Sequence, residues 1–198
     1  MKGIFLDIET DGLDPDMHQA LEVGVSIYDL HTMTCICEYS SFIRCSERHW
    51  AFGSDPRALA VNGITFEDVK DAKEASEVCS DLAELFLSHE IDKTNSVFIC
   101  QNPSFDRGFF PQIMPVETQY ELELPYHWLD LASMYWIKML VPQKVNGRII
   151  TYHPDIRRPP MSKDAIAHGL GIPPEEKPHR AINGVNHLIS CYKALIDV

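Results

Sequence analysis

The stretch GIFLDIET, residues 3–10, places two carboxylates inside an otherwise apolar run. The run predicts a buried strand, where an unpaired charge is costly. Residues two apart on a strand face the same side, so we expect Asp7 and Glu9 to lie side by side. A cation would relieve their repulsion, and hard oxygen ligands favour Mg²⁺ or Mn²⁺. Because turn signals follow at Asp11-Gly12 and Asp14-Pro15, a strand end with solvated carboxylates is the open alternative.

The composition predicts a single globular domain over residues 1–198. Hydrophobic residues make up 45% of the chain and charged residues 23%, which is ordinary for a soluble protein. No apolar run approaches the roughly 20 residues that span a bilayer, and no cleavable signal precedes the first strand, so we expect no membrane association. Six cysteines do not make a disulfide scaffold in a chain of this size. We expect them to be reduced thiols in a cytoplasmic protein.

The net charge of −12 would repel a nucleic acid at long range. The charges are unevenly distributed, however. Residues 67–92 predict a solvated acidic helix face, whereas residues 138–163 form a basic stretch. Two interpretations of the basic stretch stay open, a track for a phosphate backbone and an ordinary surface loop. Its six basic side chains are Lys138, Lys144, Arg148, Arg157, Arg158 and Lys163.

Hydrophobic periodicity predicts an α/β fold with the element order βββαβαβα, and hence a mixed sheet with helices on its faces. The first three strands are expected to form an antiparallel meander, and the wholly apolar run 96–100 is typical of a central strand. Residues 45–66 are predicted to be irregular. The predicted strands are 3–9, 21–28, 34–44, 96–100 and a short one from 128; the predicted helices are 71–89, 105–114, the segment ending near 140, 162–170 and 181–196.

Two further motifs carry polar residues next to predicted elements. Asp106 follows the strand 96–100 and the turn-forming Asn102-Pro103-Ser104, although an acid in a first helical turn also simply suits the helix dipole. His179 directly precedes the last predicted helix. A lone histidine is usually an ordinary surface or packed residue, but it is also the side chain best suited to take a proton near neutral pH.

Taken together, the three motifs resemble those of the DEDDh class of 3′–5′ exonucleases, the DnaQ-like group. That group includes DNA polymerase proofreading subunits, ribonuclease T and oligoribonuclease. The resemblance rests on residues 5–13, 102–106 and 178–181 and covers about residues 3–196. It implies a ribonuclease H-like fold, with a five-stranded mixed β-sheet flanked by α-helices.

The resemblance also implies the roles of individual residues at a site holding two Mg²⁺ or Mn²⁺ ions. Asp7 would bridge both ions, Glu9 would join the ion on the nucleophile side, and Asp106 would hold the second. His179 would act as the general base for the attacking water. The residues implied to contact substrate are Thr10, Asp11, Leu13, Asn102 and Phe105. Phe105 is equally consistent with core packing.

The function implied is a metal-dependent 3′–5′ exonuclease acting on the 3′ ends of single-stranded DNA or RNA, with a role in DNA repair. The sequence does not distinguish DNA from RNA. A homodimer or an association with a polymerase is a possible partnership for such an enzyme. The alternative is a catalytically weak or inactive nucleic-acid-binding or polymerase-associated module of the same fold.

Gly184 is the feature that favours this alternative. The third motif of the family has an aspartate five residues after the histidine, where this chain has Gly184. Glycine there costs the helix roughly 1 kcal/mol relative to alanine, and the sequence shows no structural purpose for it. Three accounts are open: an introduced or accidental inactivating substitution, a natural site completed by Asn183, Asn186 or water, and a relative that binds without cutting. Reduced activity relative to Gly184→Asp is expected.

Overall fold

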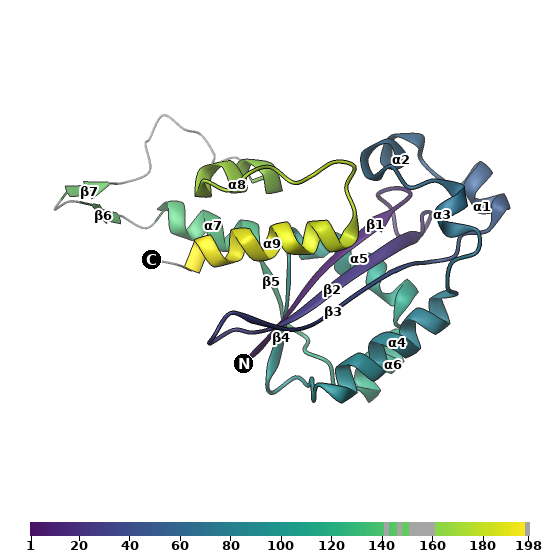
Figure 1. Ribbon diagram of the computed structural model, residues 1–198, viewed down its shortest axis with the longest axis horizontal. Helices are drawn as coiled ribbons and strands as arrows, with labels where there is room; N and C mark the ends of the chain where they lie inside the picture. Colours follow the sequence, from purple (N-terminus) through teal and green to yellow (C-terminus); the bar gives the residue numbers. More distant parts are fainter. Residues whose placement is uncertain (141–142, 146–147, 151–160, 197–198) are drawn as a thin grey trace.

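The computed structural model describes residues 1–140 and 161–196, together with the backbone of residues 143–145 and 148–150. Its centre is a five-stranded sheet with helices on both faces (Figure 1). The strands are β1 (Lys2–Thr10), β2 (Ala20–Asp29), β3 (Thr34–Phe42), β4 (Ser96–Cys100) and β5 (Trp128–Asp130), in the spatial order β3-β2-β1-β4-β5. β1, β2 and β3 form the predicted antiparallel meander, and β4 and β5 run parallel to β1. The predicted mixed sheet is therefore confirmed.

Alternation along β1 divides the core between the two faces of the sheet. Ile4, Leu6 and Ile8 point into a core formed with α4 (Ala75–Ser88) and α5 (Pro103–Ile113). Phe5 points into the opposite core, which is formed with α7 (Leu131–Leu140), α8 (Lys163–Leu170) and α9 (Ala181–Ile196). Successive side chains of a strand alternate between faces, so Asp7 and Glu9 follow Phe5 onto the α9 face.

The segment predicted to be irregular contains helix. Residues 45–66 include α1 (Glu47–Phe52) and α2 (Pro56–Asn62), and α3 (Phe66–Val69) begins at their end. These helices are too short to show an amphipathic stripe, so caps define them instead: Ser46 accepts from the His49 N–H, and Asp55 from the Arg57 N–H.

Other differences lie at element boundaries and in short elements. The helix predicted over 71–89 begins at Ala75, after a capping box between Glu74 and Glu77. α6 (Val116–Glu121) and the hairpin of β6 (Gln143–Val145) and β7 (Arg148–Ile150) were not predicted. In the part of the chain that the structure describes, none of the helices is both long and apolar enough to cross a bilayer.

The first turn of α9 lies directly against the sheet at Gly24. Gly24 pairs with Asp7 across the antiparallel ladder of β1 and β2. A Cβ atom at Gly24 would lie 2.6 Å from the carbonyl carbon of Ala181 and 2.7 Å from its oxygen. Only a residue without a side chain permits this approach, which brings the N-terminal end of α9 over the middle of β1.

We expect Gly24→Ala to lower the free energy of unfolding by about 1–3 kcal/mol, because the added methyl group would push α9 away from β2. Urea unfolding measures the change. Gly108→Ala is the matched control, since its Cβ would meet only Pro15 Cγ at 3.5 Å, an ordinary contact. That control lies inside α5 and should gain up to about 1 kcal/mol. Equal stability of Gly24→Ala and the wild type would contradict the close approach.

Candidate active site

The three predicted carboxylates meet where β1 passes the end of β4. Asp7 and Glu9 lie on the α9 face of β1, and Asp106 lies in the first turn of α5. The parallel ladder between β1 and β4 runs only to Phe5 and Ile99. Beyond it the Ile8 N–H donates to Asp106 Oδ1 at 3.0 Å instead of to a strand. Beyond the end of β4, the Asp106 side chain thus takes the place of a strand carbonyl as hydrogen-bond acceptor for β1.

Burial disfavours the ionised form of these three carboxyl groups. It raises the pKa of Asp7 above its usual value. Burial, with the Asp7 charge adding to it, raises the pKa of Glu9 to about 8 and holds the pKa of Asp106 well above its ordinary range. The influence of Asp7 on both partners shows that the three carboxylates share one electrostatic environment.

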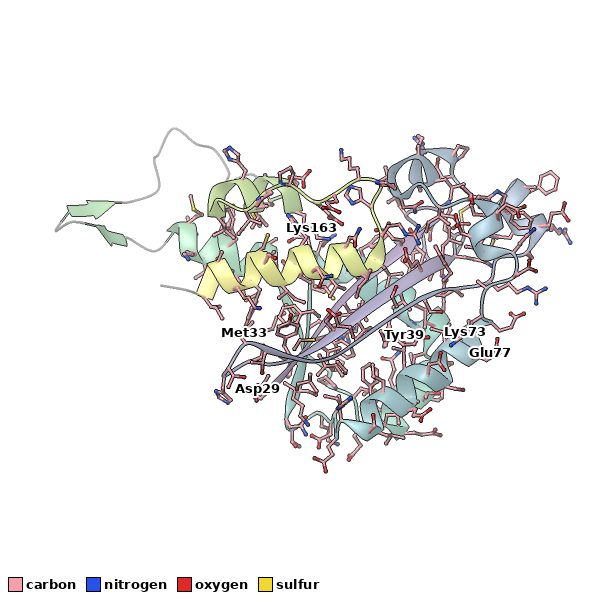
Figure 2. All side chains as sticks on the ribbon, viewed as in Figure 1. Asp29, Met33, Tyr39, Lys73, Glu77 and Lys163 are labelled. Atoms are coloured by element: carbon pink, nitrogen blue, oxygen red, sulfur yellow. The ribbon has the colours of Figure 1, made fainter. Side chains whose placement is uncertain are left out.

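Within the part of the chain that the structure describes, one ammonium group lies among these carboxylates. Lys163 is the first residue of α8, after the N-cap Ser162, and its side chain is 15% exposed. Lys163 is labelled in Figure 2, between the ribbons of α8 and α9. Its Nζ lies 3.3 Å from Asp7 Oδ1 and 3.0 Å from Glu175 Oε2. Although burial lowers the pKa of Lys163, Asp7 and Glu175 more than offset that effect and raise it above its usual value. In turn Lys163 lowers the pKa of Asp7, Glu9 and Asp106, against the larger effect of burial.

Lys163 and Glu175 are site residues that sequence reasoning missed. The sequence assigned Lys163 to a basic stretch with two open interpretations, and neither places it among carboxylates. Of the other basic residues in that stretch, Arg157 and Arg158 lie outside the described residues. Local composition contains no signal for the contact with Asp7, because 156 residues separate the two partners.

Glu175 connects Lys163 with His179. Its side chain is 1% exposed, and its Oε1 lies 3.5 Å from His179 Nδ1. Both contacts of Glu175 are within ion-pair distance, but neither carboxylate oxygen has a hydrogen bond of good geometry. The His179 backbone N–H donates to the Val61 carbonyl at 3.4 Å, which holds this residue against α2. The structure therefore places the predicted general base on the same side as Asp7, Glu175 and Lys163.

Glu22 fixes the N-terminal end of α9 over the site. It lies opposite Glu9 in the β1–β2 register. Its carboxylate accepts from the Ala181 N–H at 3.2 Å and from Arg180 Nε and Nη2 at 3.1 and 3.3 Å. A carboxylate at the first turn of a helix satisfies free N–H groups and suits the helix dipole. The sequence pattern did not single out Glu22, because its partners come from the other end of the chain.

Gly184 has a packing role, in contrast to the expectation from sequence. A Cβ atom at this position would lie 2.0 Å from Asp7 Oδ2 and 2.9 Å from Lys163 Nζ. The glycine therefore leaves room for the Asp7–Lys163 ion pair. Asn183 and Asn186, the amides considered as replacements for the missing carboxylate, line a separate pocket with Pro173 and Ser190.

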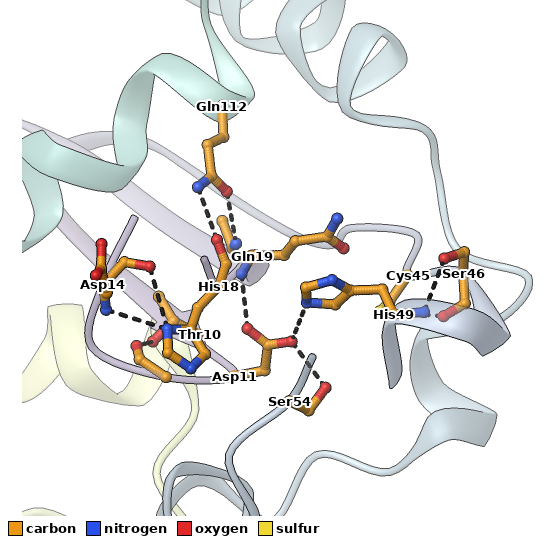
Figure 3. A network of polar contacts seen from close by, with 12 residues as sticks. Thr10, Asp11, Asp14, His18, Gln19, Cys45, Ser46, His49, Ser54 and Gln112 are labelled. Carbon is orange, nitrogen blue, oxygen red and sulfur yellow. Dashed lines mark hydrogen bonds and ion pairs between the residues drawn. The ribbon is translucent and has the colours of Figure 1, made fainter. Parts of the chain in front are cut away.

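The end of β1 and the loop that follows it contain the first three predicted substrate contacts, in different environments. Asp11 is fully buried and accepts from the Gln19 N–H at 2.6 Å and from Ser54 Oγ at 2.8 Å, with His49 Nε2 at 2.7 Å (Figure 3). Its carboxylate is therefore occupied by the protein, and so is its backbone, because the Asp11 N–H donates to the Gln19 carbonyl at 3.1 Å and the Asp11 carbonyl accepts from the Asp55 N–H at 2.7 Å. Thr10 is also buried and donates from Oγ1 to the Gly12 carbonyl at 2.6 Å. Leu13, by contrast, is 79% exposed.

Asn102 and Phe105 border the site from the start of α5. Asn102 has a φ of 57°, a left-handed conformation that asparagine tolerates. Its N–H donates to Asp130 Oδ1 at 3.0 Å, and its Oδ1 accepts from Ser104 Oγ at 2.8 Å. Phe105 packs against Phe109, with ring centroids 5.0 Å apart, at the margin of the core. Core packing therefore accounts for part of the Phe105 surface, as the sequence left open.

The donor set fits a hard divalent cation. Asp7, Glu9 and Asp106 offer only oxygen atoms, and the buried, raised-pKa state of these acids is one that a cation would relieve. Among the described residues, no group of three or more His, Cys, Asp or Glu side chains forms a cage that could hold a metal ion. Such a cage is not required, because Mg²⁺ usually binds through one or two carboxylates, with water and substrate phosphate as its other ligands.

Without divalent ions, the stability of the protein should fall as the pH rises from about 4.5 to 8. Over this interval the folded protein keeps a proton on Glu9 that the unfolded chain releases, so the free energy of unfolding decreases with pH. One such group contributes at most about 1.4 kcal/mol per pH unit. Urea unfolding in EDTA at several pH values measures the slope. Glu9→Gln should flatten it, and the surface change Glu121→Gln should not; equal slopes for wild type and Glu9→Gln would refute the assignment.

Solved exonuclease structures share this fold at low sequence identity. E. coli exonuclease I in complex with a dT13 oligonucleotide matches with a TM-score of 0.72 and 17% identity, over 97% of this chain and 40% of that chain. A full-length 3′-exonuclease matches with a TM-score of 0.70 and 16% identity, over 96% and 59%. A 3′-exonuclease described in 3′-end-specific recognition of histone mRNA stem-loop matches with 0.70 and 14%, over 99% and 64%. This chain thus spans less than two thirds of each of these proteins.

The family comparison covers almost the whole chain. No curated protein sequence matches. The family model described as RNase_T, exonuclease, matches residues 4–189, a range that includes Asp7, Glu9, Asp106 and His179. The chain therefore belongs to the RNase_T exonuclease family.

Proposed function

We propose that this protein is a metal-dependent 3′–5′ exonuclease that hydrolyses the terminal phosphodiester bond of single-stranded DNA or RNA. The observation that carries the proposal is the convergence of Asp7, Glu9 and Asp106 on the end of β1, with His179 on the same side. A fold built only for binding has no need to bury three carboxylates together, since each costs desolvation energy.

The three carboxylates would hold Mg²⁺ or Mn²⁺ against the scissile phosphate. When bound, the ion supplies charge stabilisation for the phosphoryl displacement and for the oxygen that leaves. Ile8 contributes through its backbone, because its N–H orients the carboxylate of Asp106. The cation also counters the net charge of −12, which otherwise repels a nucleic acid strand.

His179 would take the proton of the attacking water. Its Nδ1 faces Glu175 at 3.5 Å, which leaves Nε2 as the nitrogen that accepts the proton. The resulting imidazolium would be stabilised by the buried Glu175 carboxylate. Glu175 acts in this scheme as a positioning residue, because it orients the ring and does not reach the water.

A second candidate function is binding without cutting. The observation that favours it is the ion pair between Lys163 and Asp7, since it occupies one oxygen of the carboxylate placed at the centre of the site. A polymerase partner, a second copy of the chain and a role in repair stay predictions.

Cleavage of 5′-labelled DNA and RNA oligonucleotides in Mg²⁺ or Mn²⁺ tests the proposed function. We expect the wild type to shorten strands stepwise from the 3′ end. Asp7→Asn and Asp106→Asn should lower the rate at least about 100-fold, because each removes an ion ligand, and His179→Ala about 100-fold or more. EDTA should stop the reaction. Binding without shortening by the wild type in both metals would establish the second candidate instead.

Substitution of Leu13 tests whether its side chain contacts the terminal nucleotide. Its exposed side chain lies three residues beyond the end of β1 and is available to pack against a base. We expect Leu13→Ala to raise KM by about 5–30-fold, the equivalent of losing a buried aliphatic contact of about 1–2 kcal/mol, with little change in kcat. Met17→Ala, a change at an exposed residue of the same loop, should leave KM as in the wild type. Similar KM values for both variants would contradict the contact.

A further inference from the structure

We infer that Lys163 takes the place of one of the two divalent ions expected from the resemblance, so that the site operates with a single divalent ion. The inference rests on the proposed nuclease function. It concerns this chain's own departure from the two-ion pattern, and it can be tested without any cleavage reaction.

The position of the ammonium group is the first argument. Lys163 Nζ lies within ion-pair distance of Asp7, the carboxylate expected to bridge both ions, and of the buried Glu175. An ammonium has three N–H donors and no acceptor, so two donors can serve these carboxylates and one is left for water or a phosphate oxygen. A positive charge at this point does for Asp7 what a metal ion would do, namely balance its negative charge.

The absence of a side chain at Gly184 supports the same assignment. In the family pattern this position carries the carboxylate that completes the nucleophile-side ion. Here a Cβ atom would fall 2.0 Å from Asp7 Oδ2 and 2.9 Å from Lys163 Nζ. A side chain at position 184 would therefore require the ends of the Asp7 and Lys163 side chains to move. The glycine and the lysine are therefore two parts of one arrangement, which an isolated loss of aspartate does not explain.

The burial of the Glu175 carboxylate beside Lys163 also supports the assignment. Its carboxylate is almost completely buried, and neither oxygen has a hydrogen bond of good geometry, so Lys163 is its main source of compensating charge. The Glu175 N–H donates to Asp164 Oδ1 at 3.3 Å, which ties this residue to the same helical turn that carries Lys163. Loss of Lys163 would leave the Glu175 carboxylate with only the 3.5 Å contact to His179 among the described residues, and a poorly compensated buried charge is unfavourable.

The number of bound Mn²⁺ ions distinguishes a filled place from a merely missing ligand. Electron paramagnetic resonance titration of the metal-free protein with Mn²⁺ counts them. We expect one ion per chain for the wild type and still one for Gly184→Asp, because the Lys163 ammonium group, although shifted by the new side chain, would still balance the charge of Asp7. The double variant Lys163→Met with Gly184→Asp removes the ammonium and supplies the carboxylate, and it should bind two.

Lys138→Met is the matched control. Lys138 is a partly buried lysine that donates to the Ala194 and Leu195 carbonyls at the far end of α9, and its replacement should leave the count at one. Two ions in the wild type, or in Gly184→Asp alone, would overturn the inference. So would a single ion in a double variant that is folded by circular dichroism.

A second measurement covers the case in which the double variant does not fold. The ¹⁵N resonance of the Lys163 ammonium group should persist when Mg²⁺ is added to the wild type, since its contacts are kept, and its loss by exchange with water would overturn the inference. The results of these ion-binding measurements can be distinguished from those of the cleavage assay that tests the proposed function. Cleavage with two bound ions defeats only this inference, whereas a single bound ion without cleavage defeats only the function.

Discussion

The close contact between the first turns of α9 and the sheet is the constraint on which the site depends. Gly24 on β2 and Gly184 on α9 both lack the atom that would keep the two apart. Glu22 then holds the helix in place through Arg180 and the Ala181 N–H. Asp7 is covered as a result, and burial raises its pKa along with those of its neighbours. The packing of one helix end thus determines the electrostatics of the site.

Electrostatics decides what this packed site can hold. Among the described residues, one ammonium group lies among three carboxylates and Glu175, and burial disfavours ionisation of those three carboxylates in the absence of a further cation. At 4 Å and an effective dielectric constant near 20, each unit-charge pair interacts by about 4 kcal/mol. A cation is strongly favoured there, and a phosphate is not until a cation has bound. If the protein binds a metal ion and a nucleic acid strand as proposed, this balance favours binding of the metal ion first.

The sequence predicted the features that depend on local patterns. Strand periodicity placed Asp7 and Glu9 on one face, and the turn after the apolar run of β4 placed Asp106 in a first helical turn, as found. It failed for α1 and α2, which are defined by caps and not by a stripe. It also missed Lys163, because a basic residue in a basic stretch gives no indication that its side chain folds back onto β1.

The two oxygens of Asp7 show why Gly184 is more than a lost ligand. Oδ1 lies toward Lys163, whereas Oδ2 lies at the point that a side chain at position 184 would occupy. With glycine there, no side chain from position 184 occupies the space beside Oδ2, while Oδ1 is charge-compensated. One oxygen is therefore paired within the protein and the other is available to a ligand. A carboxylate with one oxygen paired to Lys163 can bind one ion through its other oxygen. To bridge two ions, Asp7 would have to lose its contact with Lys163.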